Sequence, residues 1–245
     1  MKIAAIIEAR MSSSRLPGKV LLPAAGKSML EHLVRRLSSV RLLTEIVIAT
    51  TTNDLDDQIC NLANKLNVKF FRGSENDVME RVIKAAESIS ADVVVEVTGD
   101  CPIIDPRIVE QSIKIFSKNS ADYVSNAHIR SYPDGMDVQI FKLNTLKKSS
   151  KMTDKKLDRE HVTLHIRNNP NLFSHLHIEA PDECFWPELG LTLDELKDYE
   201  LLKKIIEYFE PTDPFFSCLD VINLLRNKKS DWLEINKDIL RKGDT

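Results

Sequence analysis

Short apolar runs alternate with longer segments of helical periodicity along the first half of the chain. Short apolar runs bounded by turn residues are typical of buried strands, whereas apolar positions three and four residues apart predict one buried face of a helix. Strands are expected over residues 2–9, 45–51, 68–73, 92–100 and 121–126. Helices are expected over residues 28–40, 53–67, 77–89 and 106–118.

This alternation predicts an α/β fold in which a mostly parallel sheet is covered by helices on both faces. In such sheets, ligands bind beyond the carboxyl ends of the strands. The segments that follow the expected strands are polar and rich in turn residues, as a binding rim requires. They are residues 8–19, 51–54, 72–77 and 98–106.

The second half of the chain is less regular. Its expected elements are strands over 135–143, 174–180 and 189–193, a short helix over 158–170, and mostly helix from 194 to about 242. The lysine-rich stretch 146–156 is expected to be a solvated loop, with a mobile lid as the alternative. Because no linker or internal repeat divides the sequence, we expect one domain over 1–245, with a substrate and dimerisation portion at about 126–190.

Composition narrows the class of protein. The chain has 245 residues, 29% of them charged, and a formal net charge of -3. That balance argues against a protein that coats nucleic acid, which would be clearly basic. No stretch approaches the roughly 18 apolar residues that span a membrane. The four cysteines are widely scattered, without metal-site spacing and without a signal peptide, which predicts a cytoplasmic protein.

The segment "ARMSSSRLPGK", residues 9–19, is an unusually charged loop to follow a buried strand. It gathers three cations, three hydroxyls and a turn signal: Arg10, Ser12, Ser13, Ser14, Arg15, Pro17, Gly18 and Lys19. Hydroxyls and backbone N–H groups can surround an anion, and arginine can bind phosphate through two parallel hydrogen bonds. The spacing is not that of a Walker A loop. The loop is expected to bind an anion, with a charged surface turn as the alternative.

Two aspartates follow expected strands and are candidates for binding a cation. Asp100 ends "VVVEVTGD", and Asp194 ends "LGLTLD". Magnesium in proteins prefers one or two carboxylates together with phosphate oxygens. Each aspartate also has an ordinary alternative, since aspartate often caps a turn or a helix. Further polar candidates near the same rim are Asp134, Asp137, Glu160 and His161.

Taken together, these motifs resemble those of the CMP-sugar synthetases, the cytidylyltransferases that act on 3-deoxy-manno-octulosonate and acylneuraminate. Their loop has the pattern A-R-x-x-S-x-R-L-P-G-K. This chain matches it at Ala9, Arg10, Ser13, Arg15, Leu16, Pro17, Gly18 and Lys19. "FRGSENDVMERV", "TGDCPIIDP", "YPDGMDVQIF", "DREHVTLHI" and "LTLDELKDYELL" resemble, in the same order, the subgroup of spore-coat polysaccharide biosynthesis cytidylyltransferases.

The resemblance implies a Rossmann-like nucleotidyltransferase fold of three layers, related to the GT-A glycosyltransferases, with CTP as nucleotide and Mg²⁺ as cofactor. It assigns catalysis to Lys19, Arg15 and Asp100, and the metal to Asp100 and Asp194. It assigns nucleotide binding to Ala9, Arg10, Ser12, Ser13, Arg15, Lys19, Arg72, Thr98 and Gly99. It assigns substrate binding to Ser74, Asp134, Asp137, Glu160 and His161. The acceptor is expected to be a sugar acid or a related surface-polysaccharide precursor, and the irregular second half is expected to supply a homodimer arm.

Two positions depart from the family pattern. Thr98 stands where the octulosonate enzymes have a glutamine that helps to read the base, and Glu96 stands where the closer subgroup often has arginine. Three alternatives stay open: a nucleotidyltransferase for another nucleoside triphosphate, a GT-A-type glycosyltransferase, and a non-catalytic nucleotide-binding protein. Asp54-Leu55-Asp56 formally matches the Asp-x-Asp metal motif of glycosyltransferases, but it lies at an expected helix start.

Overall fold

The computed structural model describes residues 1–239 and is built around a seven-stranded sheet with the order β5-β4-β1-β6-β8-β7-β9. The strands are β1 Ile3–Glu8, β4 Glu45–Thr51, β5 Lys69–Gly73, β6 Val93–Thr98, β7 Tyr123–Ser125, β8 Gln139–Lys142 and β9 His175–His177. Among these strands only β8 runs antiparallel to its neighbours. A separate hairpin joins β2 (Pro23–Ala24) and β3 (Lys27–Ser28). The expectation of a mostly parallel sheet is confirmed.

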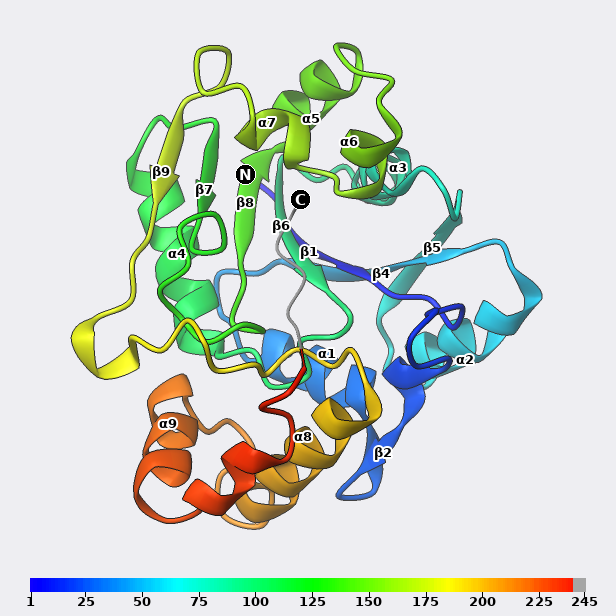
Figure 1. Cartoon of the computed structure of the whole chain (residues 1–245). Helices are drawn as coiled ribbons and strands as arrows, with labels where there is room; N and C mark the ends of the chain where they lie inside the picture. The colour runs from blue at the N-terminus through cyan, green and yellow to red at the C-terminus, as the bar shows by residue number, and fades with distance from the viewer. Residues whose placement is uncertain (240–245) are drawn as a thin grey trace.

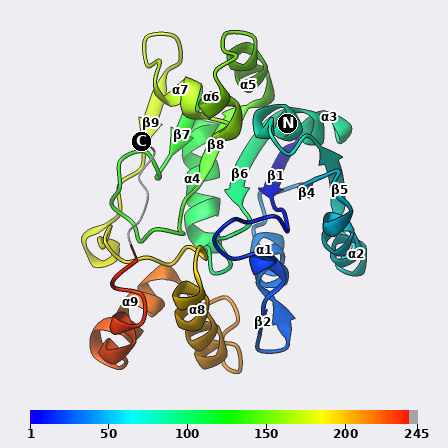
Figure 2. The same ribbon diagram turned by 45° about the vertical axis from the view of Figure 1, so that its right-hand side comes forward.

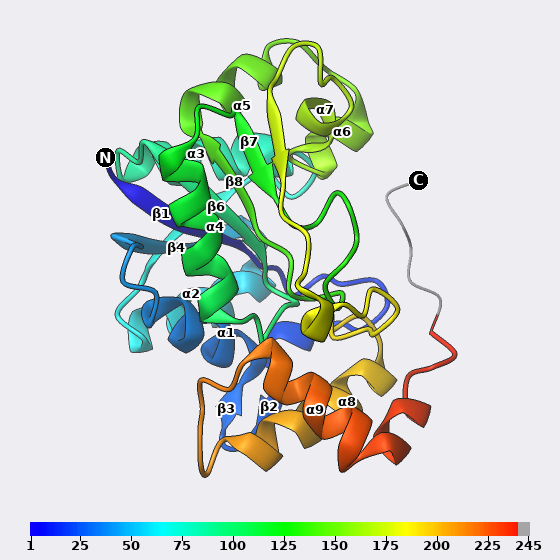
Figure 3. The same cartoon turned by 90° about the vertical axis from the view of Figure 1, so that its left-hand side faces the viewer.

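Helices cover both faces of this sheet (Figure 1). They are α1 Met29–Ser38, α2 Asp57–Lys65, α3 Val78–Ser88, α4 Pro106–Lys118, α5 Leu143–Ser150, α6 Lys156–Glu160, α7 Leu164–Arg167, α8 Leu196–Phe209 and α9 Cys218–Asn227. Side chains alternate along β1, so Ile3 and Ile7 pack with α1, α2 and α4, while Ala4 and Ile6 pack with α3 and α5. Figure 3 shows α4 lying over the first of these faces. The result is three layers, as expected.

The C-terminal helices extend one end of the molecule. α8 lies beside the β2–β3 hairpin, with α9 on its other side, while α5, α6 and α7 gather at the opposite end (Figure 2). Buried side chains of α8 and α9, such as Leu201 and Val221, join the core of the α1 face. Glu210, just beyond α8, accepts hydrogen bonds from Lys27 and Arg35, which ties the extension to the hairpin and to α1. Within residues 1–239, no helix is long and apolar enough to cross a lipid bilayer.

The strands and helices expected in the first half are present, and polar side chains cap the helices. Ser28 caps α1, because its hydroxyl accepts a hydrogen bond from the backbone of Glu31 at 3.2 Å. The helix expected over 53–67 begins with a 3₁₀ turn, Asp54–Asp56, which the Asn53 side chain caps. The first half therefore follows local sequence signals closely.

In the second half, several expected elements were wrong. Residues 189–193 form no strand; the segment makes an isolated bridge between Asp134 and Gly190. The helix expected over 158–170 is divided into α6 and α7, because Val162 adopts a φ of 29° that interrupts the helix. The lysine-rich stretch 146–156 is partly helical, since α5 continues to Ser150.

The helical region expected from residue 194 to 242 is interrupted as well. α8 and α9 are separated by a loop that contains Pro211 and Pro214, and proline cannot continue a helix. A 3₁₀ turn follows over Ser230–Glu234. Residues 240–242 lie outside the described part of the chain.

Candidate active site

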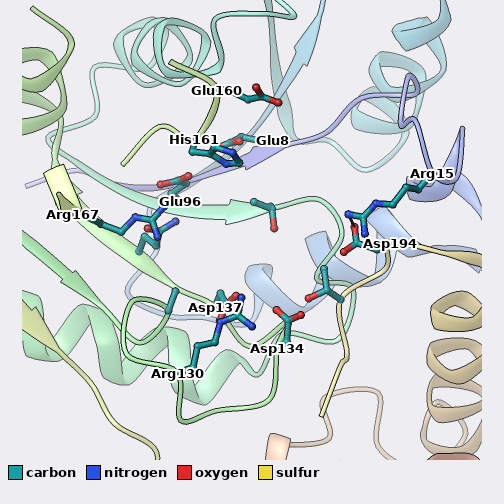
Figure 4. A pocket seen from close by; sticks show the side chains of 14 residues that line it. Glu8, Arg15, Glu96, Arg130, Asp134, Asp137, Glu160, His161, Arg167 and Asp194 are labelled. Atoms are coloured by element: carbon teal, nitrogen blue, oxygen red, sulfur yellow. Dashed lines mark ion pairs between the residues drawn. The ribbon is translucent and has the colours of Figure 1, made fainter. Parts of the chain in front are cut away.

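Two adjoining cavities open at the carboxyl ends of β1 and β6. We call the first the loop cavity, of about 330 Å³; it is lined by Glu8, Ala9, Arg10, Ser13, Ser14, Arg15, Lys19, Val20, Val78, Arg81, Thr98, Gly99, Asp100, Glu160, His161 and Asp194. We call the second the sheet cavity, of about 230 Å³; it is lined by Glu8, Arg15, Glu96, Thr98, Ala127, Arg130, Asp134, Asp137, Gln139, Glu160, His161, Arg167, Thr192 and Asp194 (Figure 4). The structure therefore has cavities beyond the carboxyl ends of the strands, where the sheet topology predicts ligand binding.

Lys19 lies at the centre of the loop cavity's charged groups. Its Nζ is 2.9 Å from Asp100 Oδ2 and 3.0 Å from Asp194 Oδ1, and the lysine side chain is only 12% exposed. Arg15 Nη2 lies 2.8 Å from the same Asp194 oxygen, and Figure 4 shows the two side chains pointing toward each other. The structure thus brings together residues as distant in the sequence as Lys19 and Asp194, which are 175 positions apart.

The protonation of this cluster follows from its contacts. Burial opposes ionisation of Asp100, but the Lys19 ammonium and a hydrogen bond from Thr98 outweigh it and lower the pKa of the carboxyl. Burial also opposes the charge on Lys19, but Asp100 and Asp194 raise its pKa above the ordinary value. At neutral pH the cluster therefore holds a charged ammonium and a charged Asp100.

The two aspartates are fixed in position by backbone contacts. The Leu193 N–H donates to the carbonyl of Asp100 at 2.8 Å, which links the loop after β6 to the segment that carries Asp194. The Asp194 N–H donates at 3.1 Å to Asp198 Oδ2, and Asp198 is fully buried. Asn236 donates to the other oxygen of Asp198 at 2.9 Å. Residues near the end of the described chain thus hold a carboxylate of the active site.

The loop over residues 9–19 is anchored by Asp56. The Met11 N–H donates to Asp56 Oδ1 at 2.8 Å, while Thr50 and Thr51 donate to Oδ2. Burial would raise the pKa of Asp56, but hydrogen bonds from Thr51 and its other donors lower it. The Asp54-Leu55-Asp56 sequence is therefore used to tie the loop to the end of β4, and it does not face either cavity.

Within the loop, the hydroxyls divide into two groups. Ser13 and Ser14 line the loop cavity. Ser12 instead donates to Glu75, which also accepts from Arg10 at 3.3 Å. Sequence reasoning did not identify Glu75, although its place in a polar turn beside the predicted rim was a usable signal. Glu75 fixes the outer side of the loop against the segment before α3.

Two residues of the "RGS" segment, Arg72 and Ser74, line neither cavity. The Arg72 guanidinium donates to the carbonyls of Thr51 and Asn53 and pairs with Asp57. Ser74 accepts from the Asp77 N–H at 3.0 Å.

The cation of this region that reaches the loop cavity is Arg81, on the first turns of α3. Sequence reasoning missed Arg81, although a cation on the apolar face of a helix, here beside Val78 and Val82, indicates a buried charge.

Gly99 brings the ends of β6 and β1 together. Its N–H donates to the Glu8 carbonyl at 2.8 Å. A Cβ at this position would lie 2.8 Å from the same carbonyl oxygen and 3.1 Å from the Ala9 Cβ. Any side chain at position 99 would therefore push apart the two strand ends that form the floor of the loop cavity.

All four acceptor candidates near the sheet cavity, Asp134, Asp137, Glu160 and His161, line it (Figure 4). Glu160 and His161 also line the loop cavity, so they lie where the two cavities meet. Gly190 pairs with Asp134 in the isolated bridge, which places the turn over 134–137 against the segment leading to Asp194.

Sequence reasoning missed four charged residues of the sheet cavity or left them without a role: Glu8, Glu96, Arg130 and Arg167. Figure 4 shows Arg167 reaching toward Glu96 and Arg130 reaching toward Asp137. Glu8 and Glu96 lie on the same face of adjacent strands and share a hydrogen bond. Burial raises the pKa of Glu8 to about 7, although Glu96 and Arg81 oppose the shift. Glu8 and Glu96 each interrupt an otherwise apolar strand, and this pattern could have identified them from the sequence.

The donor set suits a cation that also binds a ligand. Within residues 1–239, no three His, Cys, Asp or Glu side chains form a complete metal site of their own. Asp100 and Asp194 nevertheless converge on one ammonium group, so two carboxylates already face a common point of positive charge. A pair of carboxylates completed by phosphate oxygens is the arrangement that Mg²⁺ prefers. The residues present therefore fit a phosphate-bound magnesium ion.

Comparison with known proteins identifies the class. The cytidylyltransferase family model matches residues 4–232, and the chain belongs to that family. It is 34% identical over 231 residues to the spore coat polysaccharide biosynthesis protein SpsF of Bacillus subtilis, a match that covers 92% of this chain and 94% of that protein. It is 31% identical over 147 residues to a 3-deoxy-manno-octulosonate cytidylyltransferase of Geobacter sulfurreducens, covering 59% of this chain and 58% of that protein.

A solved structure agrees over the whole length. The cytidylyltransferase from Leptospira borgpetersenii superposes with a TM-score of 0.89 at 33% identity, and the match covers 99% of this chain and 100% of that one. The Rossmann-like nucleotidyltransferase fold is confirmed, and the chain is a CTP-using nucleotidyltransferase.

Proposed function

We propose that this enzyme transfers CMP from CTP to a hydroxyl group of a sugar acid, or of a related surface-polysaccharide precursor, and releases pyrophosphate. The observation that carries the proposal is the Lys19 cluster with Asp100 and Asp194, in a cavity that adjoins a second cavity lined by arginines and carboxylates. The loop cavity suits a triphosphate, and the sheet cavity suits an acceptor. The names of the Bacillus and Geobacter relatives support this class of acceptor.

The proposed cofactor is Mg²⁺, held by Asp100 and Asp194. When bound, such an ion would neutralise phosphate charge and favour ionisation of the acceptor hydroxyl. Lys19, between the two carboxylates, keeps them close together before a nucleotide arrives. Asp198 keeps Asp194 in that position through its backbone hydrogen bond.

The main requirement of this reaction is to stabilise the negative charge on the phosphate groups. The acceptor oxygen forms a bond to the α-phosphorus, the bond from that phosphorus to the bridging oxygen breaks, and pyrophosphate leaves with the electron pair. Phosphoryl transfers of this kind depend on positioning and electrostatic stabilisation more than on covalent help from the protein. Lys19 and Arg15 would stabilise the departing pyrophosphate, and Ser13 with the loop backbone would orient the phosphates.

The sheet cavity would orient the acceptor. Arg130 and Arg167, which line this cavity together with Arg15, would bind the carboxylate of a sugar acid, while Asp134 and Asp137 can accept hydrogen bonds from sugar hydroxyls. His161 and Glu160, at the junction of the cavities, would lie nearest to the reacting hydroxyl. In this proposal the nucleotide binds in the loop cavity and the acceptor binds in the sheet cavity.

The setting proposed for the enzyme is the cytoplasm, with a second copy of the chain as its partner. All four cysteines are free thiols, which supports a reducing compartment. Exposed apolar side chains of the irregular portion, including Ile129, Leu172 and Phe185, support a contact between copies through that portion. Light scattering after size-exclusion chromatography would show a mass near 56 kDa for a dimer, twice the 27.9 kDa of one chain.

The test is a pyrophosphate-release assay over a panel of sugar acids, with CTP, UTP, GTP and ATP, with and without Mg²⁺. We expect release only when CTP, Mg²⁺ and a suitable sugar acid are present together. Asp100→Asn serves as the inactive control. Release that prefers UTP or GTP, or cleavage of a nucleotide sugar in place of CTP, would contradict the proposal.

A further inference from the structure

α6 is a short and largely polar helix, although it leads directly into the junction of the two cavities. Glu160 is its last residue and His161 follows it, and both side chains line both cavities. Of residues 156–160, all of which the structure describes, only Asp158 is buried, and Leu157 is 45% exposed. Helices in proteins owe most of their stability to the packing of an apolar face, and one of five residues is not stable alone. Polar contacts must therefore hold α6 in place.

Arg159, next to Glu160, makes polar contacts that reach other helices. Its Nε lies 3.0 Å from both Oδ1 and Oδ2 of Asp77, and its Nη2 donates to Oδ2. Its Nη1 donates to the Ser150 carbonyl at 3.1 Å. A contact through two guanidinium nitrogens fixes the orientation of a carboxylate as well as its distance. Arg159 thereby joins α6 to the start of α3 and to the end of α5.

Asp77 is itself fixed, because it caps α3. Its Oδ1 accepts a hydrogen bond from the Glu80 N–H at 2.8 Å. The side chains of Arg159 and Asp77 are 19% and 27% exposed, so the pair is partly shielded from water and salt. The two residues are 82 positions apart in the sequence. Their contact is thus a feature of the folded protein that relates α6 to a helix lining the loop cavity.

The other buried polar contact of α6 is local. The Thr153 hydroxyl donates to Asp158 Oδ2, five positions further along the chain. This hydrogen bond closes the turn that leads into α6. The position of α6 relative to α3 depends on the longer-range contact between Arg159 and Asp77.

The chain is anchored again directly after His161. Val162 is fully buried in the core beneath α3 and α5. Its φ of 29° lies in the left-handed region, which β-branched residues rarely adopt. Strained backbone of this kind persists only where its surroundings hold it. Glu160 and His161 are therefore exposed side chains between two fixed neighbours, Arg159 and Val162.

We propose that Asp77 and Arg159 are positioning residues, whose ion pair holds Glu160 and His161 where the acceptor hydroxyl meets the nucleotide. The inference rests on the proposed transfer of CMP, and it gives a role to two residues that line neither cavity. Without the pair, α6 would shift and carry both side chains with it. A displacement of about 1 Å caused away from the chemistry can lower a rate about a hundredfold.

Two substitutions break the pair while keeping the size of the side chains. Asp77→Asn retains an oxygen that can cap α3, because asparagine caps helices as well as aspartate does, but its amide N–H groups would face the guanidinium. Arg159→Gln removes the two-nitrogen donor. Lys147→Gln is the matched control, since Lys147 pairs with Glu87 and so joins α3 to α5 in place of α6.

The experiment combines steady-state kinetics, with 3-deoxy-manno-octulosonate and N-acetylneuraminate as acceptors, and calorimetry of CTP binding with Mg²⁺. For Asp77→Asn and Arg159→Gln we expect kcat/KM for the acceptor to fall roughly 10- to 100-fold. The affinity for CTP should change less than about threefold. The double variant should be no worse than either single variant, because both remove one contact. Arg159→Lys should recover part of the loss, and Lys147→Gln should keep wild-type kinetics.

Two kinetic results would overturn the inference. If both variants melt at a lower temperature but keep the wild-type kcat/KM, the pair stabilises the fold without positioning the site. If the affinity for CTP falls as much as kcat/KM for the acceptor, the pair supports the whole site and has no particular effect on Glu160 and His161.

A second measurement does not depend on turnover. In enzyme with ¹³C-labelled histidine, the His161 ring resonance should move in Arg159→Gln and Asp77→Asn and should stay in place in Lys147→Gln. His32, buried on α1, is the internal control. A His161 resonance that does not move would overturn the inference. If the wild type uses no sugar acid but the resonance moves as expected, the proposed function fails and the positioning of His161 by the pair stands.

Discussion

The loop cavity and the sheet cavity adjoin, but they are built in different ways. The loop cavity takes three cations, Arg10, Arg15 and Lys19, from one continuous segment, residues 9–19, and one carboxylate from the aspartate that follows β6. The sheet cavity gathers side chains from β1, β6, β8, the 127–137 segment, α6, α7 and the chain before Asp194. In the loop cavity, Lys19 lies between two carboxylates. In the sheet cavity, Arg130 and Arg167 point toward acidic side chains.

The loop cavity therefore suits a task that all such enzymes share, binding a triphosphate, and the sheet cavity suits one that differs between enzymes, recognising the acceptor. A triphosphate and its metal require the same charges in any enzyme that uses them, and a compact motif can supply them. An acceptor is recognised by a three-dimensional arrangement of groups, and such an arrangement can be assembled from distant segments. We therefore expect changes in the loop cavity to affect every acceptor equally, and changes in the sheet cavity to depend on the acceptor used.

The largest effect is expected for Lys19→Ala. It removes the ammonium between Asp100 and Asp194, and losing one such electrostatic contact typically costs about 3 kcal/mol in the transition state. Turnover should fall roughly a hundredfold or more for every acceptor. Steady-state kinetics with two sugar acids checks this, with circular dichroism as the folding control. Turnover near the wild-type value would remove Lys19 from catalysis.

A smaller effect is expected for Gly135→Ala, which acts on the sheet cavity. Gly135 has a φ of 101°, and a Cβ there would lie 2.7 Å from both the carbonyl carbon and oxygen of Leu191. The substitution should cost about 2–3 kcal/mol of stability and raise the KM for the acceptor more than the KM for CTP.

Gly26→Ala is the matched control for this substitution. Gly26 also has a positive φ, of 77°, but a Cβ at this position would have no other atom within 4 Å. Only the backbone cost of about 1 kcal/mol should therefore appear. Chemical denaturation compares the two variants. Equal losses of stability would show that the contact with Leu191 is unimportant.

The fold was predictable from the sequence where local signals act alone. Buried parallel strands and amphipathic helices are local patterns, so β1, β4, β6 and α4 lie where expected. The segment 189–193 was mistaken for a strand because Leu189, Leu191 and Leu193 alternate and are buried. Pairing depends on a neighbour that the pattern does not reveal, and here the segment meets single residues, Asp134 and Asp100, in place of a strand.

The residues of the candidate site also fall into two groups, those that sequence motifs indicated and those that only the folded structure reveals. The motifs that resemble the CMP-sugar synthetases pointed to Lys19, Asp100 and Asp194, and the structure brings these three together. Arg81 was not predictable as a residue of the loop cavity, because its place there depends on how α3 packs beside β5 and β1. The pairing of Glu8 with Glu96 depends on the register of β1 against β6, which no local pattern specifies.

Glu8→Gln is expected to change how the stability of the protein depends on pH. Burial raises the pKa of Glu8 from 4.5 to about 7, so the native state binds the proton more tightly than the unfolded state. The stability from this group is fully present below about pH 4.5 and is lost as the pH rises through 7. Glutamine does not titrate, so the variant should gain about 2–3 kcal/mol relative to wild type between pH 5 and pH 8.

Thermal melts of both proteins across that range measure the difference. Glu45→Gln is a suitable control, because hydrogen bonds from Lys69 and Lys2 lower the pKa of Glu45, and its effect on stability should have the opposite sign. A constant difference between Glu8→Gln and wild type at all pH values would mean that Glu8 titrates normally.

The smallest effect is expected for Arg72→Ala, and it tests where the loop cavity ends. The Arg72 guanidinium donates to the carbonyls of Thr51 and Asn53, beyond β4, and does not line the cavity. Its ion pair with Asp57 is largely exposed, and such pairs contribute about 0–1 kcal/mol. The affinity for CTP should therefore change less than about threefold. Calorimetry with CTP and Mg²⁺ measures this affinity. A tenfold or greater loss in Arg72→Ala would extend the nucleotide site past Gly73 and would mean that Arg72 leaves its carbonyl partners when CTP binds.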